Sequence, residues 1–281
     1  MPAFGRRTLL AGAAALALTG CAPPGQRLTA PTVSPSGSVR EQLAEVMEIY
    51  GSNTDQLGLS IHDRTSGGTF EFRGDYDSQS ASIAKVMIVL LALRQARTEG
   101  PELTFDQYGL ASRAVIESDN DAADALWELV GGKASYDELA GALELGHTHS
   151  DDRSEFWSWT HTTPVDQQTL VDRLLDGSPA LNTEDRLYLL DLMSRTNAEQ
   201  TWGVGHDRGG EVTVQMKNGW VQFQSLDNLW AVNSIGHVVG KDRDYTAAIM
   251  CRMPTFDEGR SLVDAIGAQI FQILGTGQLD A

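Results

Sequence analysis

The apolar stretch from Val86 to Leu93 most strongly limits the folds that this chain can adopt. It reads Val-Met-Ile-Val-Leu-Leu-Ala-Leu and carries no polar side chain. A helix that is apolar on every side lies in the core of a domain, so the sequence predicts a buried central helix here. Ser82 and Lys85 stand in its first turn, and their three-residue spacing places both side chains on one face. Burying a lysine is costly unless its charge is used, and a serine beside an amine can act as a nucleophile.

The first 20 residues are expected to be an export signal rather than part of this domain. Arg6-Arg7 precedes an apolar run, Thr8 to Leu18, that is too short to cross a bilayer. Both the twin-arginine and the general secretory routes fit this pattern. The run ends in Leu18-Thr19-Gly20-Cys21, which resembles the bacterial lipobox, and this resemblance implies cleavage before Cys21 and a lipid on its thiol. The alternative is an ordinary signal peptide followed by an incidental cysteine.

Residues 21–39 are interpreted as the lipidated cysteine and a flexible tether, because they contain four prolines among Ser, Thr and Gly. We therefore expect an exported protein that its lipid anchors to the outer face of the cell membrane. We expect residues 40–281 to form a single domain. Strand patterns near residues 57–72 and 212–253 flank a mostly helical middle, so we expect an α/β sandwich whose antiparallel sheet combines both ends of the chain.

Charge and composition exclude several partners and cofactors. The net charge is −17, and removing Arg6 and Arg7 with the signal would make it −19. Such a surface repels phosphate backbones, so nucleic acid is not expected to bind. Cys251 is the only cysteine besides Cys21 and lies in an apolar run, so it is interpreted as a buried hydrophobe rather than a disulfide partner. No cofactor is indicated, and we expect a monomer.

One irregular polar segment offers side chains that a metal could bind. These are His147, His149, Asp151, Asp152 and His161. A solvated loop is the preferred interpretation, so no metal site is predicted there. Trp157 and Trp159 in the same segment are interpreted either as packing this loop onto the domain or as a surface for stacking a ligand.

Three short motifs together indicate a chemistry that none would indicate alone. They are Ser82-x-x-Lys85, Ser118-Asp119-Asn120 and Lys217-Asn218-Gly219, in this order along the chain. This set resembles the active site of penicillin-recognising serine enzymes, particularly the class A β-lactamases. The resemblance covers nearly all of the chain from Arg40 onward.

The residue types in these motifs suit acyl transfer. Ser82 would attack a carbonyl carbon, and Lys85 could take its proton only if the amine is neutral. Lys217 could lower the pKa of Lys85 and attract a substrate carboxylate. Ser118 would bridge the two lysines and pass a proton to the leaving nitrogen.

The expected substrate-binding groups are Asn120, Asn218, Gly219 and Trp220. Asn120 would hold Lys85 and the substrate amide by hydrogen bonds. The family resemblance implies an oxyanion hole made by the backbone N–H groups of Ser82 and Trp220, which would contribute several kcal/mol to the transition state.

Two features depart from the family pattern. Asn218 stands where the family usually has Thr or Ser, and its amide has a different geometry for donating to a carboxylate. Glu155 lies at nearly the family spacing for the deacylating glutamate, but the Leu-Asn that should follow is replaced by Ser158-Trp159 and the loop is short. Glu155 is interpreted either as the deacylating base or as a salt-bridge partner of Arg153 or another arginine.

The sequence therefore predicts a serine hydrolase that acts through an acyl-enzyme on Ser82. Hydrolysis of β-lactams is the leading hypothesis, and the departures around Glu155 would allow a slow rate. A D,D-peptidase or amidase acting on cell-wall peptides is the alternative within enzymes. A lipoprotein that binds such ligands without hydrolysing them is the alternative outside enzymes.

Overall fold

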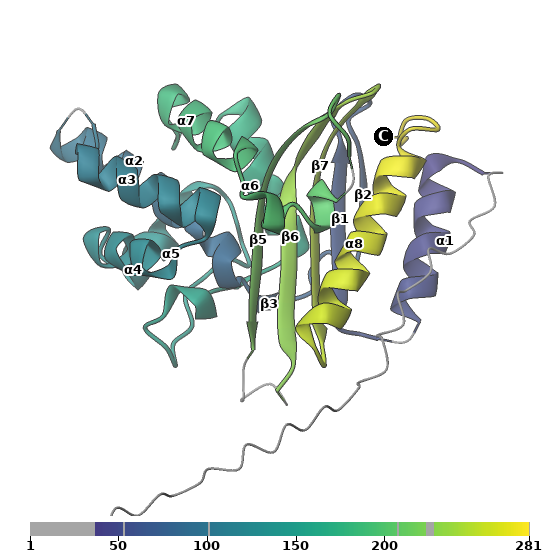
Figure 1. The fold of residues 1–281 in the computed structure, drawn as a ribbon, viewed down its shortest axis with the longest axis horizontal. Helices are drawn as coiled ribbons and strands as arrows, with labels where there is room; N and C mark the ends of the chain where they lie inside the picture. The colour runs from purple at the N-terminus through teal and green to yellow at the C-terminus, as the bar shows by residue number, and fades with distance from the viewer. Residues whose placement is uncertain (1–36, 53, 101, 207, 223–227, 281) are drawn as a thin grey trace, which may run out of the picture.

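A computed structural model of the chain describes residues 37–280, except positions 53, 101, 207 and 223–227. The predicted export signal, Cys21 and most of the predicted tether lie outside the described residues. The described part is built around one five-stranded sheet with helices on both faces (Figure 1). No helix among the described residues is long and apolar enough to reach across a bilayer.

The sheet joins the two ends of the chain, as predicted. Its strand order is β2-β1-β7-β6-β5 and every neighbouring pair is antiparallel. The strands are β1 (Leu57–Asp63), β2 (Gly68–Phe72), β5 (Thr213–Gln222), β6 (Trp230–Gly240) and β7 (Arg243–Met253). The register of β1 against β7 pairs Leu57 with Cys251 and Asp63 with Tyr245. Cys251 is fully buried in this ladder, which confirms its interpretation as a core residue.

Two terminal helices cover one face of the sheet. These are α1 (Val39–Gly51) and α8 (Phe256–Ile273), which lie side by side in Figure 1. A capping box starts each helix: Ser38 with Glu41 for α1, and Thr255 with Glu258 for α8. Their apolar sides and the sheet form one of the two hydrophobic cores.

The second core surrounds α2 (Ala84–Glu99) on the opposite face of the sheet (Figure 1). The side chains from Val86 to Leu93 are at most 3% exposed, so the prediction of a buried helix is confirmed. The other helices of this layer are α3 (Phe105–Ser112), α4 (Asn120–Leu129), α5 (Lys133–Ala142), α6 (Pro164–Asp176) and α7 (Thr183–Ser194).

Several short elements connect these layers near the predicted motifs. They are the pair β3 (Ser78–Gln79) and β4 (His161–Thr162), the 3₁₀ turns η1 (Ala81–Ile83), η3 (Trp157–Trp159), η4 (Ala198–Gln200) and η5 (Gly203–Gly205), and the π-helical turn η2 (Arg113–Glu117). Ser82 therefore lies in a 3₁₀ turn just before α2, not in the α-helix itself. The Lys217-Asn218-Gly219 motif lies inside β5, which continues to Gln222.

Candidate active site

The backbone around Ser82 is held in an unusual conformation. Ala81, the residue before it, has a φ of 49° in the left-handed region although it is not glycine. The side-chain amide of Asn233 on β6 donates to the backbone oxygens of Gln79 (2.9 Å) and Ser80 (3.1 Å). These bonds fix the chain that enters η1, so Ser82 reaches the pocket while Ile83 is buried.

Gly219 allows β5 to lie directly against this turn. A Cβ atom at this position would be 2.7 Å from the backbone nitrogen of Ser82 and 2.8 Å from that of Ile83. Any side chain at position 219 would therefore push the strand and the turn apart. The close approach puts the backbone of Gly219 beside the N–H of Ser82, next to the position where the family resemblance implies an oxyanion hole.

Lys85 is fully buried and makes three hydrogen bonds. Its Nζ donates to the Ser118 backbone oxygen (2.6 Å), to Asn120 Oδ1 (2.8 Å) and to Ser118 Oγ (3.3 Å). Burial lowers the pKa of Lys85 to about 8, against the opposing attraction of Asp119 and Asp124. A measurable share of Lys85 is consequently neutral near neutral pH and able to accept a proton.

Ser118 connects the two lysines. It has a left-handed φ of 60° at the junction of η2 and α4. Nζ of Lys217 donates to Ser118 Oγ (3.0 Å) and to the backbone oxygen of Asn218 (2.9 Å). Burial, and next the positive charge of Lys85, lower the pKa of Lys217 well below its ordinary value. Both amines thus contact one hydroxyl.

The remaining residues of the second motif hold α4 in place. Asp119 caps the helix, because its Oδ1 accepts from the backbone N–H of Ala122 (3.0 Å). Asn120 begins the helix and directs its side-chain oxygen to Lys85 (2.8 Å). One turn of chain therefore fixes both Ser118 and Asn120.

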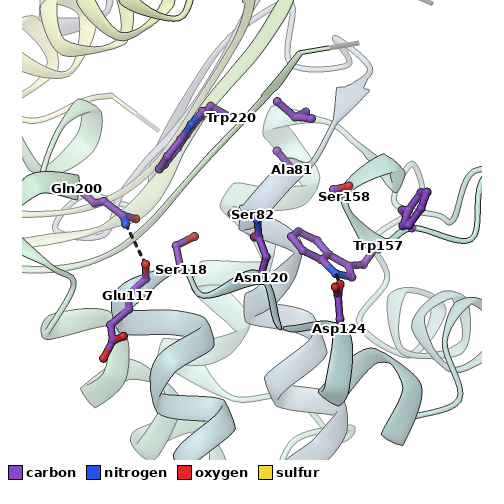
Figure 2. A pocket seen from close by; sticks show the side chains of 12 residues that line it. Ala81, Ser82, Glu117, Ser118, Asn120, Asp124, Trp157, Ser158, Gln200 and Trp220 are labelled. Atoms are coloured by element: carbon purple, nitrogen blue, oxygen red, sulfur yellow. Dashed lines mark hydrogen bonds between the residues drawn. The ribbon is translucent and has the colours of Figure 1, made fainter. Parts of the chain in front are cut away.

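These groups meet at a pocket of about 370 Å³ between β5, η1, α4 and the 150–160 segment (Figure 2). Of the predicted site residues, Ser82, Ser118, Asn120 and Trp220 line this pocket. The two lysines lie behind this lining: Lys85 donates hydrogen bonds to Ser118 and Asn120, and Lys217 donates one to Ser118. The full lining comprises Ala81, Ser82, Glu117, Ser118, Asn120, Asp124, Phe156, Trp157, Ser158, Gln200, Trp220 and Val221.

Asn218 does not reach the pocket. Its side chain is fully buried, and its amide nitrogen donates to the backbone oxygens of Gln200 (2.7 Å) and Trp202 (3.1 Å). The expectation that this amide binds a substrate is therefore not supported. Asn218 instead ties η4 and η5 to the edge strand.

Glu155 also lies outside the pocket lining. Its side chain is 87% exposed, and its Oε1 is 3.3 Å from Nζ of Lys133. Arg153, which was one expected partner, pairs with Asp151 at 2.7 Å instead. The salt-bridge interpretation of Glu155 therefore fits the structure, with a lysine as partner instead of an arginine. Glu155 does not occupy the position that a deacylating base would need, because it is outside the pocket lining.

Trp157 occupies the space beside Lys85. The indole is 6% exposed, and its ring centroid lies 4.7 Å from Nζ of Lys85. Its Nε1 donates to Oδ1 of Asp124 at 2.6 Å. The structure thus supports the interpretation that Trp157 packs the short loop onto the domain, and the side chain that its ring covers is Lys85.

Sequence reasoning missed Asp124 as a pocket residue. A signal was present, because Asp124 follows Asn120 by four residues and so lies on the same face of α4. Figure 2 shows its carboxylate and the Trp157 indole pointing toward one another on the side of the pocket where Ser82 and Asn120 lie.

The histidine-rich segment is more ordered than the predicted solvated loop. His161 contacts Asp77 with Nδ1 (2.9 Å) and Asp151 with Nε2 (3.2 Å), and its ring stacks on His149 at 5.1 Å. Asp151 is buried, which the interpretation of this segment as solvated did not predict. Within the described part of the chain, no cluster of three or more His, Cys, Asp or Glu side chains is arranged to hold a metal ion.

The chain is similar in sequence and in fold to known proteins. Residues 99–274 match the model of the β-lactamase enzyme family. The Mycobacterium tuberculosis protein LppW, whose name proposes a lipoprotein, is 26% identical over 241 residues, which is 81% of this chain and 74% of LppW.

Two solved structures have similar folds. A class A β-lactamase from Bacteroides cellulosilyticus superimposes with a TM-score of 0.72 at 15% identity and covers 86% of this chain and 100% of its own. A variant of PBP-A, solved as an acyl-enzyme complex with penicillin G, gives a TM-score of 0.69 at 21% identity and covers 84% of this chain and 96% of its own.

Proposed function

Since the chain belongs to the β-lactamase enzyme family, we propose that it is a serine hydrolase whose Ser82 forms an acyl-enzyme with β-lactams and releases it slowly. The observation that carries this proposal is the hydroxyl of Ser118, which contacts Lys85 at 3.3 Å and Lys217 at 3.0 Å at the edge of the pocket that Ser82 lines.

The proposed acylation uses Ser82, Lys85 and Ser118. Ser82 Oγ attacks the carbonyl carbon while its proton passes to the neutral amine of Lys85. The carbon–nitrogen bond then breaks, and Ser118 gives its proton to the leaving nitrogen. Ser118 recovers a proton from the lysines bonded to it, and the product is an ester on Ser82. The N–H groups of Ser82 and Trp220 would stabilise the oxyanion.

Deacylation has much less support from the same geometry. Water must reach the ester with a base beside it, but the indole of Trp157 covers Lys85 and cannot accept a proton. Glu155 is exposed and paired with Lys133. The ester is therefore expected to persist, which favours a penicillin-binding enzyme over an efficient β-lactamase. The PBP-A variant that holds penicillin G as an acyl-enzyme has the same fold.

The native substrate is then more consistent with a cell-wall peptide than with an antibiotic. A peptide amide needs the same attack by Ser82, whose side chain lines an open pocket of about 370 Å³. Anchoring on the outer face of the membrane through Cys21 would place the domain near such peptides. The lipobox and the name of LppW support this placement.

Labelling with a fluorescent penicillin tests the nucleophile. The wild-type protein should retain one covalent label per molecule after denaturation, and Ser82→Ala should retain none. A wild-type protein that binds no label, while remaining folded by circular dichroism, would identify a binding lipoprotein without acyl-transfer chemistry.

Replacing Trp157 tests the proposed cause of slow release. Trp157→Ala should shorten the half-life of the penicillin ester by about tenfold, because it opens space for water beside Lys85. Trp157→Phe, which keeps a ring there, is the matched control and should change the half-life little. Equal half-lives in all three proteins would show that the indole does not limit deacylation.

Rapid turnover of a chromogenic cephalosporin by the wild-type protein would contradict slow release directly. It would restore efficient β-lactam hydrolysis as the function. Comparing wild type with Glu155→Ala would then show whether this exposed carboxylate contributes after all.

A further inference from the structure

We propose that the pocket selects acyl donors that carry an ammonium group on their acyl side chain, with Asp124 as the counter-ion. This inference rests on the proposed acyl-enzyme chemistry of Ser82 and names the class of substrate that the same pocket prefers.

The lining of the pocket contains carboxylates but no basic side chain among the described residues. Asp124 and Glu117 line it, and Figure 2 shows the Glu117 carboxylate directed away from Ser82. The neighbouring cations Lys133 and Arg113 are paired with Glu155 and Asp119. Lys85 and Lys217 are fully buried behind the lining. An anionic group on the acyl side would find no free partner here, whereas an ammonium group would find Asp124.

The carboxylate of Asp124 is fixed through one oxygen and open to a ligand at the other. Its Oδ1 accepts from Trp157 Nε1 at 2.6 Å, so the carboxylate stays at one side of the pocket. Within the part of the chain that the structure describes, no protein donor contacts the second oxygen, Oδ2, and the residue is exposed. A carboxylate with one fixed and one open oxygen can accept a hydrogen bond from a ligand without first reorganising.

An apolar surface lies beside this carboxylate. Phe156, which precedes Trp157 in the chain, is 67% exposed at the pocket, whereas most large apolar side chains of the domain are buried. When a ligand covers an exposed ring at a pocket edge, apolar surface is removed from water, and this favours binding of the ligand. Phe156 would pack against the apolar stem of an acyl group whose amine reaches Asp124.

Two penicillins that differ by one amine provide the test. Ampicillin and benzylpenicillin share the lactam, the carboxylate and the phenyl ring, but only ampicillin has an amine on its acyl side chain. At slightly acidic pH, where this amine is protonated, the second-order rate of Ser82 acylation should be about fivefold higher for ampicillin. The preference should shrink at alkaline pH as the amine loses its charge.

Asp124→Asn should remove this preference while keeping the hydrogen bond from Trp157, because the asparagine oxygen can still accept it. Asp121→Asn is the matched control: it removes the same charge from the same helix outside the pocket lining, and the preference should remain.

The outcomes separate this inference from the proposed function. If both penicillins acylate Ser82 at equal rates in the wild-type protein, or if Asp124→Asn keeps the preference, the selectivity is wrong and the acyl-enzyme chemistry stands. If neither penicillin acylates Ser82, the proposed function itself is wrong, and with it this inference.

Discussion

At the scale of single residues, the proposed mechanism makes the reactivity of Ser82 depend on the protonation of Lys85. The amine donates to Ser118 and Asn120 and lies under the ring of Trp157, so water cannot solvate its charge well. Burial therefore lowers its pKa to about 8, although Asp119 and Asp124 oppose this shift. A lysine with this pKa is a usable base near neutral pH, which an exposed lysine is not.

The acylation rate should follow the neutral fraction of Lys85. With benzylpenicillin, we expect the second-order rate constant to rise about tenfold per pH unit well below the pKa, and to level off above about pH 8. Rapid mixing from about pH 6 to about pH 9 measures this profile, with circular dichroism to confirm folding at each pH. A flat profile would exclude Lys85 as the base.

Gly219 should tolerate no side chain. Gly219→Ala would place a Cβ 2.7 Å from the backbone nitrogen of Ser82. We expect this displacement to slow acylation by about 100-fold and to lower the free energy of unfolding by about 2 kcal/mol. Penicillin labelling and urea denaturation measure the two effects.

Gly109→Ala is the matched control for this substitution. A Cβ at that position on α3 meets no atom within 4 Å. The control should acylate normally and become slightly more stable, because alanine favours helix more than glycine does. Equal behaviour of the two variants would mean that the close approach of β5 to η1 has no role.

At the scale of elements, the short segment from His149 to Thr162 forms one wall of the pocket. His161 on β4 fastens it to the chain before α2, because its two ring nitrogens contact Asp77 and Asp151. The hydrogen bond with Asp77 raises the pKa of His161, burial opposes this, and the contact with Asp151 adds to it. The protonated imidazole therefore stabilises this wall.

This contact predicts a pH-dependent stability. A raised pKa in the folded state means that the contribution is fully present below the unfolded pKa of about 6.5, and is lost as pH rises through the folded pKa. The free energy of unfolding should thus fall in His161→Phe by about 1 kcal/mol near pH 5.5, and the difference should shrink near pH 9.

Urea denaturation of both proteins at the two pH values measures this difference. His147→Phe, a substitution at an exposed histidine just before this segment, is the control and should show no such dependence. A loss from His161→Phe that is the same at both pH values would indicate packing rather than charge.

At the scale of the whole molecule, the site depends on contacts between distant parts of the chain. Pairing of β1 with β7 closes the sheet from both ends, and Asn233 on β6 holds the turn that carries Ser82. The helical layer supplies Lys85, Ser118 and Asn120 against the edge strand β5. The pocket therefore exists only when the sheet and this layer are both assembled.

The parts of this arrangement that local patterns encode could be predicted from the sequence. The apolar run after Lys85 indicated the buried helix, and alternating residues near both ends indicated the sheet. The three motifs indicated which side chains would meet, and the structure brings Ser82, Ser118 and Asn120 to one pocket with both lysines behind them.

The parts that depend on tertiary neighbours could not be predicted. Asn218 turns to the backbone of Gln200 and Trp202, which lie in a segment with no recognisable spacing from β5. The path of the short loop decides that Trp157 covers Lys85 and that Glu155 meets Lys133. Periodicity carries no information on such a path, because the loop has no repeating pattern.

The central claim is that Ser82 forms a covalent ester that water releases slowly. Intact-protein mass spectrometry after incubation with benzylpenicillin and removal of the excess measures this most directly. We predict that the wild-type protein gains the mass of one penicillin, mapped to the peptide containing Ser82, and keeps it over hours, while Ser82→Ala gains none. No mass increase in folded wild-type protein, or an adduct that persists in Ser82→Ala, would contradict the account.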